Sequence, residues 1–132
     1  MSETSVAKKA RPLSPHLQVY RLPLPAVSSI THRITGIALT VGTLVLTWWL
    51  VAAASGPDDF DTAQRVLGSP IGLLALLGWT WAFGYHLLKG IQHLIWDAGV
   101  GVNTASAQRN SALVFGASFV LTAIVWIAAF AL

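Results

Sequence analysis

Three long stretches of apolar residues, separated by short polar segments, dominate the pattern along the chain. They comprise 21 residues from Ile34 to Ala54, 19 from Pro70 to Leu88 and 22 from Ser111 to Leu132, and none contains Asp, Glu, Lys or Arg. A helix needs about 20 apolar residues to cross the hydrocarbon core of a bilayer, and a helix satisfies its own backbone hydrogen bonds there. We therefore predict an all-α membrane protein with three transmembrane helices.

Residues that flank these stretches indicate where the helices begin and end. Pro23 precedes the first helix, Ser69 is a capping residue followed by proline, and Gly99 suits the left-handed turn that ends a helix. The predicted elements are an arm over 1–24, helices over about 25–54, 70–97 and 111–132, a polar loop over 55–69 and a polar link over 97–110.

Composition supports a location in the bilayer. Of the 132 residues, 55% are hydrophobic and 10% are charged, and the mean hydropathy is +0.65. In soluble domains about a quarter of the residues are usually charged, and disordered chains are poor in apolar residues. The composition therefore excludes both a soluble domain and a disordered chain. The chain has no cysteine, which excludes disulfides, a cysteine-held iron–sulfur cluster and a covalently attached c-type haem.

The basic residues predict the orientation of the chain. Five of the eight Lys and Arg residues lie before residue 34, so the positive-inside rule places the arm on the cytoplasmic side and loop 55–69 outside. They are not interleaved with aromatic residues, so we expect no nucleic-acid partner. The arm lacks the apolar core of a secretory signal and is expected to lie against something at the inner surface. A chain that starts at Met1 without a presequence favours a bacterial plasma membrane over the mitochondrial inner membrane.

A first group of polar residues lies near the start of the first helix. Ser29, His32, Arg33 and Gly36 have the spacing of residues that share one helix face. A helix over 25–54 is about 45 Å long, so its first turns extend beyond the hydrocarbon core to the inner interface. There, His32 and Arg33 either anchor the helix by reaching the headgroups or form a polar functional site together with Ser29.

A second group lies near the end of the second span. His86, Lys89, Gly90, His93 and Asp97 are also spaced to share one face. Measured from an inner boundary near Asp97, His93 is about 6 Å deep and His86 about 16 Å deep, close to the midplane. A carboxylate at a helix C-terminus opposes the helix dipole, so we expect Asp97 to pair with a cation or relay protons, unless it is simply solvated.

His86 has two interpretations at this depth. It bonds to a neighbouring helix, or its neutral imidazole is an axial ligand of haem iron. His93 lies about 10.5 Å away along the same helix and cannot bind the same iron. A haem at His86 therefore takes its second ligand from another helix, which implies a partner subunit, because His32 is expected at the depth of His93. A haem between His32 and His93 stays open at this point.

Two segments resemble a known family. RPLSPHLQVYRLPLPAVSSITHRITG (11–36) and YHLLKGIQHLIWDAG (85–99) are similar to the cytochrome b556 subunits of succinate dehydrogenase, the haem-bearing membrane anchors of respiratory complex II. The resemblance extends over the whole chain. It implies a helix bundle completed by a second small anchor subunit, with a haem b shared between the two. It also implies electron transfer from succinate, through a flavoprotein subunit and an iron–sulfur subunit, to ubiquinone at the inner face.

The resemblance also implies roles near the haem. His86 matches the axial ligand, His32 matches a residue near the haem propionates, and His93 lies on the same side. Gln92 departs from the family, since many relatives have Arg at this position, and Lys89 is a substitute cation one turn earlier. The chain carries no succinate or flavin site, so no activity is expected from it alone.

Ser29 and Arg33 match residues of the ubiquinone site. A fixed guanidinium stabilises the negative charge that develops on a quinone during reduction, and a hydroxyl can donate a hydrogen bond to a quinone carbonyl. Two other functions remain open on the residues alone. In the first, the chain is a haem-free structural anchor. In the second, it is a small ion-translocating subunit in which His86, Lys89 and Asp97 form a relay.

Overall fold

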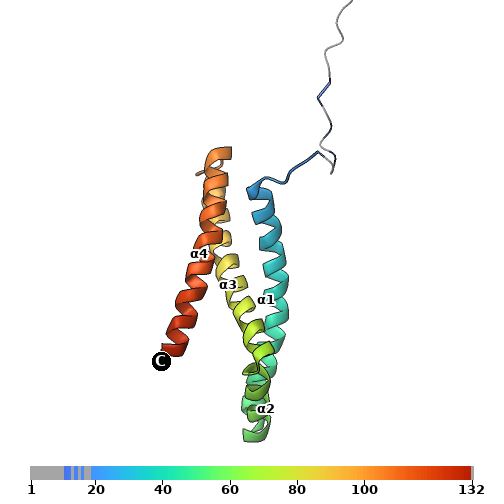
Figure 1. The fold of residues 1–132 in the computed structure, drawn as a ribbon, viewed down its shortest axis with the longest axis vertical. Coiled ribbons are helices and arrows are strands. Elements are labelled where there is room, and N and C mark those ends of the chain that lie inside the picture. Colours follow the sequence, from blue (N-terminus) through green and yellow to red (C-terminus); the bar gives the residue numbers. More distant parts are fainter. Residues whose placement is uncertain (1–10, 13, 15, 17–18, 132) are drawn as a thin grey trace, which may run out of the picture.

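The computed structural model describes residues 11, 12, 14, 16 and 19–131, which contain four helices. They are α1 (Leu24–Ser55), α2 (Pro57–Leu67), α3 (Pro70–Asp97) and α4 (Thr104–Ala131). Helices α1, α3 and α4 are long and apolar enough to cross a membrane, which confirms the predicted all-α membrane protein with three transmembrane helices. In Figure 1, α3 lies between α1 and α4, and α2 lies beside the end of α1.

Helix α1 begins, α3 ends and α4 begins at one end of the bundle, which we call the arm end (Figure 1). The described residues before α1 lie outside any helix and include a turn in which the Tyr20 amide donates to the His16 carbonyl at 2.8 Å. The arm predicted over 1–24 falls largely outside the described residues.

Small residues allow α1 and α3 to pack closely. A Cβ added to Gly42 would overlap the indole ring of Trp79, and one added to Gly36 would lie 3.1 Å from Cε1 of His86. Such residues are typical of contacts between membrane helices, where backbones approach without large side chains between them. The two glycines therefore fix the spacing of α1 and α3 over about two helix turns.

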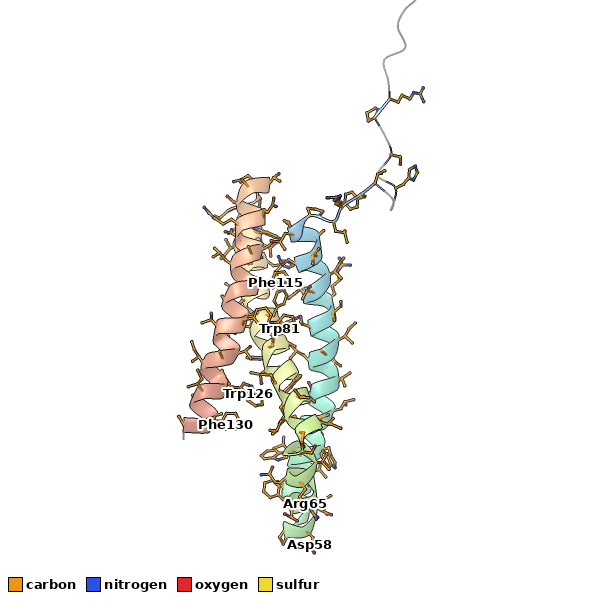
Figure 2. The ribbon with its side chains drawn as sticks, viewed as in Figure 1. Asp58, Arg65, Trp81, Phe115, Trp126 and Phe130 are labelled. Carbon is orange, nitrogen blue, oxygen red and sulfur yellow. The ribbon has the colours of Figure 1, made fainter. Side chains whose placement is uncertain are left out.

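The contact between α3 and α4 combines small and polar residues. Nε1 of Trp81 donates to Oγ of Ser118 at 3.0 Å, and a Cβ on Gly84 would lie 3.2 Å from Leu121. The rings of Trp81 and Phe115 lie in the space between the helices (Figure 2). Interhelical hydrogen bonds and close packing replace the hydrophobic effect as the source of helix association in lipid.

The segment predicted as a polar loop over 55–69 contains helix α2 instead. Gly56 separates α1 from α2. Its φ of 132° is a conformation that residues with a side chain rarely adopt, so glycine suits this break between the two helices. Pro57 occupies the first position of α2, and Asp58 in the first turn and Arg65 in the last complement the helix dipole. These helix signals are present in the sequence, but the high polarity of the segment led to the prediction of a loop.

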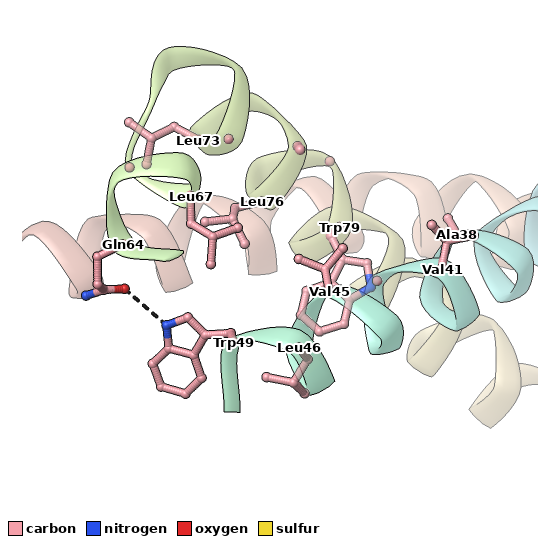
Figure 3. Close-up of a pocket in the computed structure, with 15 residues that line it drawn as sticks. Ala38, Val41, Val45, Leu46, Trp49, Gln64, Leu67, Leu73, Leu76 and Trp79 are labelled. Carbon is pink, nitrogen blue, oxygen red and sulfur yellow. Dashed lines mark hydrogen bonds between the residues drawn. The ribbon is translucent and has the colours of Figure 1, made fainter. Parts of the chain in front are cut away.

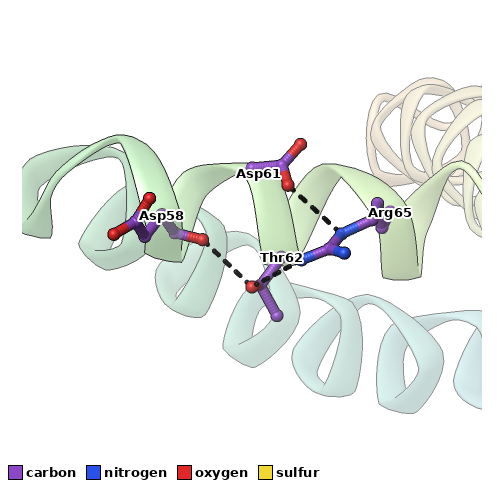
Figure 4. A network of polar contacts seen from close by, with 4 residues as sticks. All are labelled: Asp58, Asp61, Thr62 and Arg65. Atoms are coloured by element: carbon purple, nitrogen blue, oxygen red, sulfur yellow. Dashed lines mark hydrogen bonds and ion pairs between the residues drawn. The ribbon is translucent and has the colours of Figure 1, made fainter.

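Helix α2 packs against the last turns of α1. Ala63 is fully buried, and Nε1 of Trp49 in α1 donates to Oε1 of Gln64 at 3.0 Å. On the outer surface of α2, Asp61 and Arg65 form an ion pair of 3.2 Å beside Thr62 (Figure 4). Both side chains are about 70% exposed, so this pair contributes little to stability.

The caps of α3 and α4 explain their bounds. Oγ of Ser69 accepts from the Gly72 amide at 3.1 Å, and Gly99 has φ 77°, so both predicted end signals of α3 are confirmed. Helix α4 begins at Thr104, seven residues before the predicted start at 111. Oδ1 of Asn103 accepts from the Ser106 amide at 2.9 Å, so Asn103 is the N-cap of α4. It lies in the segment predicted as a polar link.

Candidate functional site

Three histidines gather at the arm end between α1 and α3. The ring centroids of His32 and His86 lie 4.0 Å apart in a stacked arrangement, and those of His32 and His93 lie 5.1 Å apart edge to face. We call these three residues the histidine cluster. The structure thus brings together three predicted site residues from two helices that are more than 50 positions apart in the sequence.

His86 is held in one orientation by the backbone of α1. Its Nδ1 lies 3.1 Å from the carbonyl oxygen of His32 and 3.3 Å from Oγ1 of Thr35. Because a carbonyl only accepts hydrogen bonds, Nδ1 carries the proton and Nε2 carries the lone pair. Gly36 provides the room for this ring, since a Cβ there would lie 3.1 Å from Cε1 of His86.

This geometry fits a haem-ligating histidine. Metal-bound histidines usually donate their second ring N–H to a carbonyl or carboxylate, which fixes the tautomer and the ring direction. Within the described part of the chain, no group of three His, Asp or Glu side chains could hold a metal ion by itself. A haem supplies four nitrogen ligands of its own, so one oriented imidazole from this chain is a sufficient contribution.

The histidine cluster does not hold a haem between two of its own members. The rings of His32 and His93 touch at 5.1 Å between centroids, and those of His32 and His86 touch at 4.0 Å. Two axial ligands must lie on opposite faces of a porphyrin. As these rings are placed, neither pair leaves room for a macrocycle, so the haem between His32 and His93 that the sequence left open is not supported.

The stripe predicted on the first helix divides in the structure. Ser28, His32 and Thr35 face α3, and Ser28 and Thr35 are buried. Ser29 is half-buried and Arg33 is exposed, and no hydrogen bond joins either side chain to the histidine cluster within the described residues. Ser29 and Arg33 are therefore less buried than Ser28 and Thr35, residues of α1 that face α3.

The stripe predicted on the second span also divides. Lys89 is fully buried, donates to Oε1 of Gln92 at 2.7 Å and lies 4.6 Å from the centre of the Trp96 ring. Asp97 is exposed. Among the described residues no cation lies within 4 Å of its carboxylate, so the expected ion pair is not seen there. No described hydrogen bond links Lys89 to His86 or Asp97, so these three side chains are not joined directly.

Tyr85 is a site residue that sequence reasoning did not identify. It is fully buried, its hydroxyl donates to the Ser28 carbonyl at 2.9 Å, and Oγ of Ser28 lies 2.8 Å from the same hydroxyl. Ser28, His32 and Thr35 are spaced by four and three residues, which is the one signal in the sequence that could have indicated this face.

An apolar groove of about 860 Å³ lies at the opposite end of the bundle from the histidine cluster, between α1, α2 and α3 (Figure 3). Its polar groups include the hydrogen-bonded pair of Trp49 and Gln64, and no histidine lines it. The chemistry of this groove therefore does not suit iron ligation, and the candidate site remains the histidine cluster.

The fold and the site together define a membrane-spanning helical protein in which the backbone of α1 holds the His86 imidazole in one orientation. The sequence profile of the succinate dehydrogenase/fumarate reductase transmembrane subunit family matches residues 7–125. The chain belongs to this family.

Individual relatives agree with this assignment. The chain is 49% identical to the succinate dehydrogenase cytochrome b556 subunit of Paracoccus denitrificans over 120 residues, which cover 91% of this chain and 92% of the relative. It is 33% identical to the subunit of the same name from Rickettsia felis, over 89% of this chain and 91% of the relative. It is also 36% identical to the mitochondrial cytochrome b560 subunit of Sus scrofa, over 79% of this chain and 63% of the relative.

Proposed function

We propose that this chain is the cytochrome b membrane-anchor subunit of a succinate:ubiquinone oxidoreductase. In this function it anchors the flavoprotein and iron–sulfur subunits, holds a haem b through His86 and forms part of the ubiquinone site. The observation that carries the proposal is the hydrogen bond of 3.1 Å between Nδ1 of His86 and the His32 carbonyl. That bond leaves Nε2 as the nitrogen that binds iron.

Haem b supplies one-electron redox chemistry when it is bound. His86 holds its iron, and the His32 carbonyl and Gly36 fix the direction of the imidazole. Nε2 of His32 is buried and has no hydrogen-bond partner among the described residues, so it suits an acceptor such as a haem propionate. His93 contacts the His32 ring and is proposed as a further haem-proximal residue.

A second histidine for the haem would come from another chain. His32 stacks directly on the His86 ring at 4.0 Å between centroids, which leaves no room for a haem between them, and His93 lies on the same helix as His86. A bis-histidine haem at His86 therefore requires a histidine from a second small membrane subunit. Large exposed apolar side chains on α1, α3 and α4 leave surface both for such a partner and for lipid.

Ubiquinone reduction is assigned to the arm end of α1. Arg33 is exposed there, so its guanidinium is available to a quinone head group and stabilises the negative charge that develops on the quinone oxygen. Ser29 lies one turn earlier and supplies a hydroxyl as a hydrogen-bond donor. The site lies close to water at the membrane surface, from which two protons reach the reduced quinone. Asp97, exposed at the end of α3, is proposed to assist by an ion pair or by proton transfer.

The proposed location is a bacterial plasma membrane, with the N-terminus in the cytoplasm. Three spans and bacterial relatives support the membrane, and the basic residues before α1 support the orientation. The soluble subunits then dock at the arm end, where the quinone site lies.

A dithionite-reduced absorption spectrum of the purified complex tests the proposal. We expect the α band of a b-type cytochrome, together with four subunits and succinate-dependent reduction of ubiquinone. A complex without that band would instead show that the chain is a haem-free structural anchor.

A further inference from the structure

Tyr85 joins the beginning of α1 to the middle of α3. The hydroxyl is fully buried, donates to the Ser28 carbonyl at 2.9 Å and accepts from Oγ of Ser28 at 2.8 Å. The Ser28 carbonyl is also the acceptor of the helical hydrogen bond from the His32 amide. Tyr85 therefore makes two hydrogen bonds to a single residue of α1, in a region where water does not compete for them.

The ring of Tyr85 has little freedom to move its hydroxyl. It packs against Phe115 of α4 at 4.8 Å between ring centroids and against Trp81 at 5.5 Å. Trp81 is itself fixed by its hydrogen bond of 3.0 Å to Ser118. The hydroxyl is thus presented to α1 from a position that both α3 and α4 determine.

Two consecutive residues of α3 hold α1 at positions one turn apart. Tyr85 bonds to the Ser28 carbonyl, and His86 bonds to the His32 carbonyl. The residues that follow these two carbonyls directly are Ser29 and Arg33, the pair assigned to the quinone. Any sliding or rotation of α1 that displaces this pair must also break the bonds to α3.

We propose that Tyr85 is a positioning residue of the quinone site, which holds Ser29 and Arg33 in register with the haem ligand His86. The inference rests on the proposed function, because it assumes that these two residues bind the quinone. Tyr85 itself does not touch the quinone or the haem. It acts through the backbone and side chain of Ser28.

Tyr85→Phe tests this inference in the assembled complex. The variant keeps the aromatic packing and removes the hydroxyl. Loss of buried hydrogen bonds of ordinary strength predicts that the KM for ubiquinone rises about three- to tenfold. We expect kcat to stay within about twofold, and we expect the b-type spectrum and the succinate–dye activity to be unchanged, because His86 and the soluble subunits are not altered.

Gln64→Leu is the matched control. It also removes a hydrogen bond between two helices, the one from Nε1 of Trp49, but at the opposite end of the bundle from Tyr85. Its KM for ubiquinone should equal that of the wild type. In addition, Ser28→Ala combined with Tyr85→Phe should be no worse than Tyr85→Phe alone, since Tyr85→Phe already removes the one bond that Ser28→Ala removes.

The outcomes separate the inference from the proposed function. An unchanged KM in Tyr85→Phe with haem intact, or an equal rise in Gln64→Leu, overturns the positioning role and leaves the proposed function standing. If Tyr85→Phe fails to assemble, Ser28→Ala alone decides, because it keeps the tyrosine and should still raise the KM. A wild-type complex without a b-type haem or quinone reductase activity contradicts the proposed function itself.

Discussion

Nδ1 of His86 lies 3.1 Å from the carbonyl oxygen of His32, and this contact connects the two polar groups of the sequence. It sets the tautomer of His86 and at the same time fixes the backbone immediately before Arg33. The proposed haem ligand and the proposed quinone residue are therefore parts of one rigid unit between α1 and α3.

Replacing the imidazole of residue 86 should remove the haem. In His86→Leu we expect the b-type α band of the reduced complex to be lost or grossly altered, because leucine offers no ligand to iron. His93→Leu is the control, since that ring lies in the same cluster without the orienting carbonyl bond, and it should retain the haem. A normal haem content and spectrum in His86→Leu would refute the ligand assignment.

Replacing the guanidinium of residue 33 should affect the quinone alone. A preorganised charge that stabilises a developing anion is worth roughly 10²-fold or more, so Arg33→Leu should lower ubiquinone reductase activity by about that factor. Reduction of an artificial dye by succinate should persist, because the dye accepts electrons before the membrane site. Arg65→Leu is a matched control, since Arg65 lies on the exposed surface of α2. Equal loss of both activities in Arg33→Leu would indicate failed assembly instead.

Gly36 should be sensitive even to alanine. A methyl group there would lie 3.1 Å from Cε1 of His86, so the ring must move by a few tenths of an ångström. We expect Gly36→Ala to shift the haem α band or its midpoint potential while the complex still assembles. Gly116→Ala places the same methyl in open space on α4, away from His86, and should leave the spectrum unchanged. A wild-type spectrum and potential in Gly36→Ala would show that the imidazole tolerates displacement.

The predicted depth placed His32 level with His93 and not with His86, whereas the His32 ring contacts both, at 5.1 Å and 4.0 Å between ring centroids. The sequence was sufficient to predict the three spans, because apolar length reports them directly. It was not sufficient to predict how each helix is rotated about its axis. That rotation turns Ser28 and Thr35 toward α3, leaves Arg33 exposed and buries Lys89. The periodicity of a sequence defines a helix face about 100° wide. A single contact, such as that of Ser28 with Tyr85, depends on which edge of that face packs against the neighbouring helix.

Helix α2 was missed for a different reason. The polar composition of its segment indicated a loop, although Pro57 at the first position and Arg65 in the last turn are typical helix signals. Its stability comes from packing against α1 through Ala63 and the pair Trp49–Gln64, contacts between segments that no local pattern reports. The orientation of this helix relative to the membrane remains a prediction from the basic residues.

The absence of native cysteine makes that orientation directly measurable. Asp58→Cys places one thiol on the exposed surface of α2, and Gln108→Cys places one on the exposed surface of α4 at the arm end. With the N-terminus in the cytoplasm, a membrane-impermeant thiol reagent should label Asp58→Cys in intact spheroplasts. It should label Gln108→Cys only after the membrane is opened.

Two controls make this labelling experiment decisive. Labelling after denaturation in detergent shows that each thiol is reactive, which matters because docked soluble subunits at the arm end would cover residue 108. The wild-type chain, which has no thiol, gives the background. Labelling of Gln108→Cys in intact spheroplasts, with Asp58→Cys protected, would invert the proposed topology. It would also place the quinone site on the wrong side of the membrane to receive electrons from cytoplasmic subunits.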